Sequence, residues 1–218
     1  MLKREDITRE RIDFLIKEAS KLGPFDALSH EEREDNRRQF LKDRKTDNGV
    51  WVFGYGSLIW NPAFNFSGTV KARLFGFRRR FCLHLTIGRG SPEYPGLMLA
   101  LDKGGSCNGI AFKIEAKDVE SETEILWMRE MISGAYQPHW TKMRTEVGLL
   151  EGFTFVVNRK HPRYLGNASD EETVKLLQNG SGYLGTCKDY LANTVSDLVE
   201  LGFRDKYLER LNIKVNQK

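Results

Sequence analysis

With 218 residues, the chain is long enough for one domain, with or without an appendage, and for a sizeable hydrophobic core. Hydrophobic residues make up 40% of it and charged residues 29%, a composition that excludes extended disorder. The 34 basic and 30 acidic residues give a formal net charge of +4, and the basic residues are scattered along the chain. The charge therefore does not indicate a nucleic-acid partner.

The three cysteines, Cys82, Cys107 and Cys187, are widely spaced and form no CxxC pair, so neither a disulfide framework nor a zinc site is indicated. The four histidines share no ligand spacing, and we expect no metal and no cofactor. The chain begins with charged residues and contains no apolar run of about 18 residues. We therefore expect a cytoplasmic protein without a membrane partner. The sequence does not indicate an oligomeric state.

Residues 1–48 are predicted to form a helical extension. Apolar residues recur at helical spacing from Ile12 to Leu22, and the Gly-Pro pair at 23–24 ends that helix. Ser29 and Glu32 form a capping-box pattern that opens a second, heavily charged helix extending to about Lys45. We predict no chemistry for this extension.

Residues 49–213 are predicted to form the main unit. Short β-branched or aromatic runs, separated by Gly, Pro or Asp clusters, predict strands at 50–53, 68–75, 79–86, 97–101, 109–114, 139–146 and 153–158. Helical periodicity appears at 118–132, 171–178, 189–201 and 203–211. Because the strands mostly come first and the helices are inserted or appended, we expect an α+β fold with an antiparallel or mixed sheet that can curl into a barrel.

The first predicted strand leads into a loop that reads Gly-Tyr-Gly-Ser-Leu at 54–58. Two glycines around one aromatic residue permit backbone torsions that other residues resist, and they leave amide N–H groups bare. Successive bare N–H groups can bind an anion such as a carboxylate. A simple tight turn explains the same residues. Ile59 stands where a dinucleotide-binding fingerprint needs its third glycine, and the Gly-Lys-Ser/Thr of a phosphate-binding loop is missing.

Glu130 lies near the end of the predicted helix at 118–132, between Leu126 and Trp127 on one face. Apolar residues cover another face, so this end of the helix is expected to be buried. Burial disfavours the charged form of a carboxyl group and raises its pKa toward neutrality, which suits proton exchange near pH 7. The alternative is that Glu130 pairs with a buried arginine, such as one of the three at 78–80.

Several segments resemble the ChaC-like γ-glutamylcyclotransferase family, most closely its bacterial branch. Residues 51–60, which read Trp-Val-Phe-Gly-Tyr-Gly-Ser-Leu-Ile-Trp, are similar to its opening signature, and residues 129–136 are similar to the segment that carries its catalytic glutamate. Further matches occur in the same order at 85–90, 95–101 and 184–191. The resemblance covers about residues 50–202. One departure is Cys187, which stands where relatives usually carry an asparagine.

The resemblance implies a β-barrel of the γ-glutamylcyclotransferase-like fold with surrounding helices. It implies a glutathione-specific enzyme that forms 5-oxoproline and Cys-Gly by attack of the substrate's α-amine on its γ-carbonyl, without metal, with Glu130 as general base and acid. The implied substrate-binding residues are Val52, Phe53, Gly54, Tyr55, Gly56, Ser57, Leu58, Tyr136 and Tyr190. Two alternatives are a cyclotransferase for other γ-glutamyl amines or amino acids, and a non-catalytic regulator of cation transport that binds a γ-glutamyl ligand.

Overall fold

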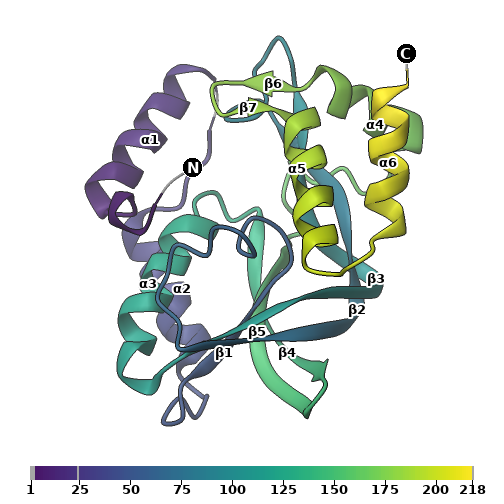
Figure 1. Cartoon of the computed structure of the whole chain (residues 1–218). Helices are drawn as coiled ribbons and strands as arrows, with labels where there is room; N and C mark the ends of the chain where they lie inside the picture. The colour runs from purple at the N-terminus through teal and green to yellow at the C-terminus, as the bar shows by residue number, and fades with distance from the viewer. Residues whose placement is uncertain (1–2, 24, 218) are drawn as a thin grey trace.

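A computed structural model describes residues 3–23 and 25–217 and contains a closed five-stranded barrel (Figure 1). The strands follow the order β1-β3-β2-β4-β5 around it. Their bounds are Val50–Gly54 for β1, Gly68–Leu85 for β2, Gly96–Ile114 for β3, Tyr136–Thr145 for β4 and Gly148–Val157 for β5. Adjacent strands are antiparallel except for β1 and β5, which pair in parallel where Val52 lies opposite Phe153. The predicted α+β class and mixed barrel are confirmed.

The two longest strands each replace a pair of predicted strands. Gly76, with a φ of +84°, lies between the predicted strands at 68–75 and 79–86, but it produces a register shift within β2 rather than a turn. On β3, Gly104 and Gly105 also have positive φ, yet pairing with β2 continues on both sides of them. Glycine clusters resemble turns in sequence, and a long cross-strand ladder carries the strand through them.

Helix α3 (Val119–Glu130) follows the 3₁₀ turn η2 (Ala116–Asp118) and packs its apolar side against the barrel. The Trp127 ring lies 5.1 Å from that of Phe155 and 5.6 Å from that of Phe153, in tilted or edge-on contacts. These rings are almost completely buried, and aromatic burial of this kind dominates core energetics. The packing fixes the last residue of the helix, Glu130, at one end of the barrel.

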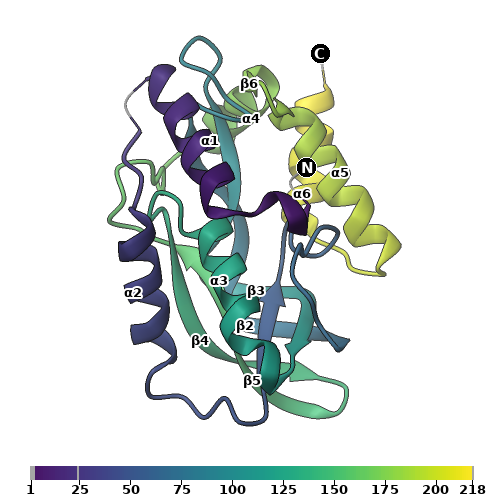
Figure 2. The same cartoon turned by 90° about the vertical axis from the view of Figure 1, so that its left-hand side faces the viewer.

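The N-terminal segment contains the 3₁₀ turn η1 (Arg4–Asp6), α1 (Arg9–Lys21) and α2 (His30–Leu41), as the helical prediction required. Ser29 caps α2 with the predicted capping box, while Pro24 lies outside the described residues. Both helices pack against α3, and they lie together on one flank of the molecule in Figure 2. Asn36 Oδ1 accepts a 2.9 Å hydrogen bond from Trp127 Nε1, which ties α2 to the barrel helix.

The C-terminal segment covers the other side of the barrel, opposite α1 in Figure 1. It consists of α4 (Asp170–Asn179), the short strands β6 (Ser181–Gly182) and β7 (Gly185–Thr186), α5 (Cys187–Glu200) and α6 (Lys206–Asn216). Within the described residues, no helix combines the length and apolar character needed to cross a membrane.

Candidate active site

A cavity of about 330 Å³, called the inner cavity below, lies where the loop after β1 meets the end of α3 and the start of α5. Its lining includes seven of the residues singled out from the sequence: Tyr55, Gly56, Ser57, Leu58, Glu130, Tyr136 and Tyr190. The loop and the carboxylate, which are far apart in sequence, therefore share one cavity. The apolar part of the lining comes from β2, β3 and β5 and from three residues outside these strands, Leu58, Ile132 and Leu184.

The loop after β1 is closed by two backbone hydrogen bonds, from Ile59 N to Gly56 O at 2.8 Å and from Asn61 N to Ser57 O at 2.9 Å. These bonds use the carbonyl groups of the loop. In the described part of the chain, no residue accepts a hydrogen bond from the N–H groups of Gly56, Ser57 or Leu58. Three neighbouring backbone donors are therefore available to a negatively charged group in the cavity.

The two loop glycines do not have the unusual torsions that the sequence suggested, because neither Gly54 nor Gly56 has a positive φ. Space is the reason for them instead. A Cβ on Gly54 would lie 2.9 Å from Phe112 Cε2, and a Cβ on Gly56 would lie 3.4 Å from the Tyr190 hydroxyl. Glycine here permits close packing behind the loop and keeps the cavity open in front of Tyr190.

Arg79 holds the loop from behind. Its side chain is buried, and its Nε donates a 2.6 Å hydrogen bond to the Tyr55 carbonyl, while Nη1 lies 3.2 Å from Asp205 Oδ2. Carbonyl and N–H groups of one trans peptide unit point in opposite directions. Fixing the Tyr55 carbonyl toward Arg79 therefore turns the N–H of Gly56 away from Arg79.

Glu130 keeps only 16% of its side-chain surface exposed. Burial raises the pKa of its carboxyl group above the usual range, and the neighbouring Arg129, with Nε 3.0 Å from Glu130 Oε1, partly opposes this rise. The alternative drawn from the sequence, that Glu130 pairs with a buried arginine, is confirmed, but the partner is the neighbouring Arg129. The arginines at 78–80 that it named as examples are not the partner: Arg79 binds Tyr55 and Asp205, and Arg80 is paired with Asp102.

Arg129 connects the carboxylate to the loop. Besides its contact with Glu130, its Nη2 donates a 3.0 Å hydrogen bond to Ser57 Oγ, and its Nη1 donates to the carbonyls of Asn61 and Pro62. The sequence assigned no role to Arg129. No local pattern marks it, because its partners lie about 70 residues earlier in the chain.

Three tyrosines, Tyr55, Tyr136 and Tyr190, line the inner cavity together with Glu130. Burial raises the pKa of Tyr190 to about 12 and holds the pKa values of Tyr55 and Tyr136 well above the usual range. All three phenols are therefore neutral at pH 7. Tyr136 donates a 2.8 Å hydrogen bond to the Leu99 carbonyl, which orients its ring at the cavity wall.

Three of the predicted substrate-binding residues do not line the cavity. Val52 and Phe53 are completely buried in the barrel core, and Gly54 is the last residue of β1, paired with Ile110. They support the loop from inside the barrel, and the structure does not support direct ligand contact for them. Cys187 is likewise buried and lies outside the lining.

A second cavity of about 390 Å³, the outer cavity, adjoins the first, and Glu130, Tyr136 and Arg163 line both. Its further walls come from the 86–89 loop, residues 161–163 and the linker between α1 and α2. That linker contributes Phe25 and Asp26, so the N-terminal extension reaches the site although no chemistry was predicted for it.

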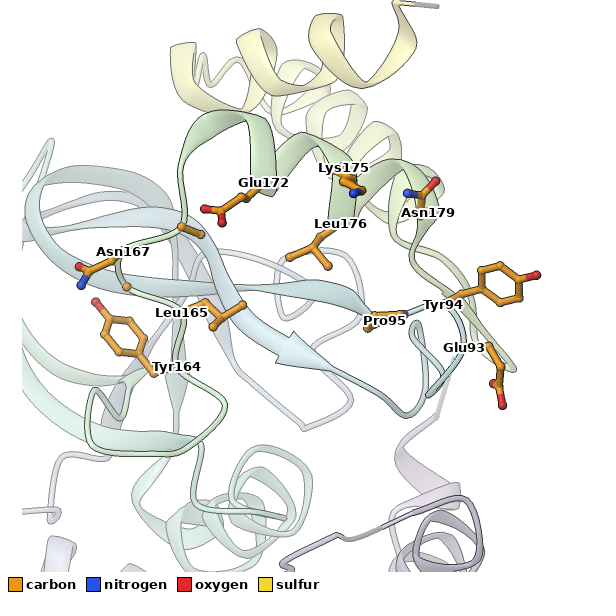
Figure 3. Close-up of a pocket in the computed structure, with 12 residues that line it drawn as sticks. Glu93, Tyr94, Pro95, Tyr164, Leu165, Asn167, Glu172, Lys175, Leu176 and Asn179 are labelled. Atoms are coloured by element: carbon orange, nitrogen blue, oxygen red, sulfur yellow. The ribbon is translucent and has the colours of Figure 1, made fainter.

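A separate cavity of about 880 Å³ lies between α4, residues 164–168 and residues 93–95 (Figure 3). Its polar side chains stand apart in Figure 3 rather than converging on one point. The Tyr164 hydroxyl is already bonded to Asp102 at 3.0 Å. Over residues 3–23 and 25–217, no group of three or more His, Cys, Asp or Glu side chains is placed to hold a metal ion. The inner and outer cavities are thus the candidate site.

A family model described as ChaC-like protein matches residues 50–218. The chain belongs to the ChaC-like family. It is 37% identical over 190 residues to the glutathione-specific γ-glutamylcyclotransferase of Escherichia coli strain K12, a match that covers 87% of this chain and 82% of the relative. The glutathione-specific γ-glutamylcyclotransferase 1 of Homo sapiens is 29% identical over 168 residues, which is 75% of each chain.

A solved structure supports the fold. The crystal structure of a γ-glutamyl cyclotransferase specific to glutathione from yeast superposes with a TM-score of 0.70 at 22% identity, over 77% of this chain and 95% of the yeast chain. The family resemblance and the fold expected from the sequence are confirmed. The E. coli match covers more of the chain than residues 50–218 contain, so similarity to that relative extends into the N-terminal extension.

Proposed function

We propose that this chain is a glutathione-specific γ-glutamylcyclotransferase that releases 5-oxoproline and Cys-Gly from glutathione. The observation that carries the proposal is the position of Glu130, a largely buried carboxylate with a raised pKa, in the same cavity as the free N–H groups of residues 56–58. The names of the E. coli, human and yeast relatives support the choice of substrate.

Substrate orientation is the first contribution of the proposed site. The α-amine and the γ-carbonyl belong to one molecule, so the cavity mainly has to hold the folded conformer in which the two approach, and such orientation effects can be large. Attack of the α-amine on the γ-carbonyl in this conformer closes the γ-glutamyl group into a five-membered ring. The neutral tyrosines and apolar wall of the inner cavity suit this compact group.

Proton transfer is the second contribution. A free α-amine has a pKa of about 8 and is largely protonated at neutral pH, so a base is required. In the proposed reaction the α-ammonium group first loses one proton to solvent, and Glu130 then accepts a second proton from the same nitrogen as the new C–N bond forms. It then delivers that proton to the departing amide nitrogen as the old C–N bond breaks. Its raised pKa matches both roles.

Charge stabilisation is the third contribution. The free N–H groups of Gly56, Ser57 and Leu58 are suited either to the substrate's α-carboxylate or to the oxyanion that develops at the γ-carbon. Arg79 supports the orientation of the Gly56 N–H through its bond to the Tyr55 carbonyl. Arg129 supports the positions of Ser57 and Glu130 together.

The direct test is to incubate the purified protein with glutathione and to quantify 5-oxoproline by chromatography. We expect stoichiometric formation of 5-oxoproline and Cys-Gly. Parallel reactions with γ-glutamyl-alanine separate the glutathione-specific enzyme from one acting on γ-glutamyl amino acids. Tight binding of glutathione without product would instead favour the non-catalytic regulator.

The proposal keeps the cytoplasmic location and the division of the chain into residues 1–48 and 49–213 that the sequence suggested. The start of the family match at residue 50 supports this division. The contacts of α1 and α2 with α3, and the contribution of Phe25 and Asp26 to the outer cavity, indicate that the extension supports the site. Fractionation of cells that produce the tagged protein tests the location.

A further inference from the structure

The inner and outer cavities meet at Glu130, and their walls differ. The loop residues 55–58 line only the inner cavity, whereas Arg89 lines only the outer one. If the γ-glutamyl group occupies the inner cavity, its γ-carbonyl lies near Glu130, and the part of the substrate beyond the scissile amide extends into the outer cavity. The outer cavity is thus placed to select the leaving group.

The outer cavity contains unpaired positive charge. Arg129 is paired with Glu130, but neither Arg89 nor Arg163 lies within 4.0 Å of any carboxylate in the described residues. Arg163 is anchored by hydrogen bonds to the His84 carbonyl at 2.8 Å and to Ser133 Oγ at 3.2 Å. Cations in a partly desolvated cavity attract an anionic ligand, because water solvates them incompletely there.

Arg89 is held in position before any ligand binds. Its guanidinium lies 5.0 Å above the centre of the Tyr190 ring, and its Nη1 is 3.4 Å from the Thr186 carbonyl. The thiol of Cys187 donates to the Arg89 carbonyl, at 3.2 Å, and so ties the backbone of Arg89 to the start of α5. A planar guanidinium restrained in this way loses little conformational entropy when it binds a carboxylate.

The negative charges facing the outer cavity are few. Its described lining contains two carboxylates, Glu130 and Asp26. Glu130 is paired with Arg129, and Asp26 is exposed on the linker between α1 and α2 and forms no ion pair within 4.0 Å among the described residues. The cavity therefore favours a leaving group that carries a carboxylate over one that is neutral or cationic.

We propose that Arg89 binds the C-terminal carboxylate of a γ-glutamyl peptide substrate, with Arg163 adding a second positive charge to the outer cavity. This inference rests on the proposed function and extends it, because it names the residue that separates γ-glutamyl peptides from γ-glutamyl amines. It also gives Cys187 a positioning role, through the backbone of Arg89.

The test compares glutathione with glutathione amide, in which the glycine carboxylate is replaced by a neutral amide. For each substrate, kcat/KM for 5-oxoproline release is measured with the wild type, Arg89→Gln and Arg89→Lys. A charge-assisted hydrogen bond corresponds to a factor of about 10 to 100, so we expect the wild type to prefer glutathione by that factor. Arg89→Gln should lose about the same factor on glutathione and less than about threefold on the amide. On glutathione, kcat/KM of Arg89→Lys should lie between the values of the wild type and Arg89→Gln.

Arg204→Gln is the matched control, because it removes the same charge from an exposed arginine paired with Glu209, a carboxylate that does not line either cavity. It should leave both kcat/KM values unchanged. An equal loss on both substrates in Arg89→Gln, or a wild type without preference for the free carboxylate, would overturn the inference. Absence of 5-oxoproline from both substrates would overturn the proposed function instead. In that case the affinities of glutathione and glutathione amide for the wild type and Arg89→Gln, measured by calorimetry, still test whether Arg89 binds the carboxylate.

Discussion

Replacing Glu130 by glutamine removes the proposed base while preserving the size of the side chain. The amide oxygen of glutamine can still accept the 3.0 Å contact from Arg129 Nε, and Arg129 keeps its bonds to Ser57, Asn61 and Pro62. An amide cannot take up the proton of the α-amine. We therefore expect kcat for 5-oxoproline release to fall by about 10²- to 10⁴-fold, the usual worth of a positioned acid–base group.

The same substitution should not destabilise the fold at neutral pH. Because burial raises the pKa of Glu130, the folded state binds the proton more tightly than the unfolded state does. Wild-type stability therefore falls as pH rises from about 4.3, the ordinary value of glutamate, through the raised pKa, at about 1.4 kcal/mol for each unit of pKa difference. Glutamine does not ionise, so Glu130→Gln does not lose stability in this way. The free energy of unfolding of the variant, relative to that of the wild type, should therefore increase over that pH range.

Glu122 provides a matched control on the same helix. It is also buried, but it is bonded to Arg4 Nη2 at 2.6 Å and to Asn65 N at 2.8 Å, and it does not line either cavity. Burial would raise the pKa of Glu122, but Arg4 and Asn65 outweigh it and lower the pKa. Its stabilising effect is therefore present above the unfolded pKa and is lost as pH falls. Glu122→Gln should cost about 1–3 kcal/mol at pH 7 and leave kcat unchanged.

Two measurements separate these effects: chromatographic 5-oxoproline release at saturating glutathione, and urea unfolding between pH 4.5 and pH 8. The expected pattern is a loss of rate without loss of stability in Glu130→Gln and the reverse in Glu122→Gln. Wild-type kcat in Glu130→Gln would refute the role of Glu130 in proton transfer. A parallel loss of rate and stability in that variant would show that Glu130 acts through the fold.

Three further predictions concern the loop and the pH profile. Gly56→Ala places a methyl group in the inner cavity, in van der Waals contact with the Tyr190 hydroxyl at 3.4 Å, and should raise KM for glutathione about tenfold because the methyl group takes up substrate space. Gly68→Ala, with nothing within 4 Å and no place in the cavity lining, should leave KM unchanged, and equal KM values in the two variants would contradict this role of Gly56. In a plot of kcat/KM against pH, the midpoint of the acidic limb should lie above about pH 4.3, because the reaction requires ionised Glu130 and the pKa of Glu130 is raised. A midpoint below that pH would exclude Glu130 as the base. Ser57→Ala should reduce kcat by no more than about tenfold, because the hydroxyl group of Ser57 serves to accept a hydrogen bond from Arg129. Complete inactivation of this variant would instead indicate that Ser57 is a nucleophile.

The sequence by itself determined the fold class, because β-branched runs and helical periodicity are local signals. It failed at Gly76, Gly104 and Gly105, where glycines that resemble turns lie inside long strands. Whether a glycine ends a strand depends on pairing with a neighbour, and that neighbour is distant along the chain. The strand count therefore needed the three-dimensional ladder between β2 and β3.

The candidate site divides in the same way. The loop at 54–58 and the carboxylate of Glu130 could be predicted, because glycine spacing and an apolar helix end are visible over a few residues and the family resemblance linked them. Only the tertiary structure brought Arg129 to Ser57, across 72 residues, and Arg79 to the Tyr55 carbonyl. Arginines in a sequence show no partner. Their roles depend on which backbone and carboxylate oxygens the closed barrel places within reach, and that is a property of the folded chain alone.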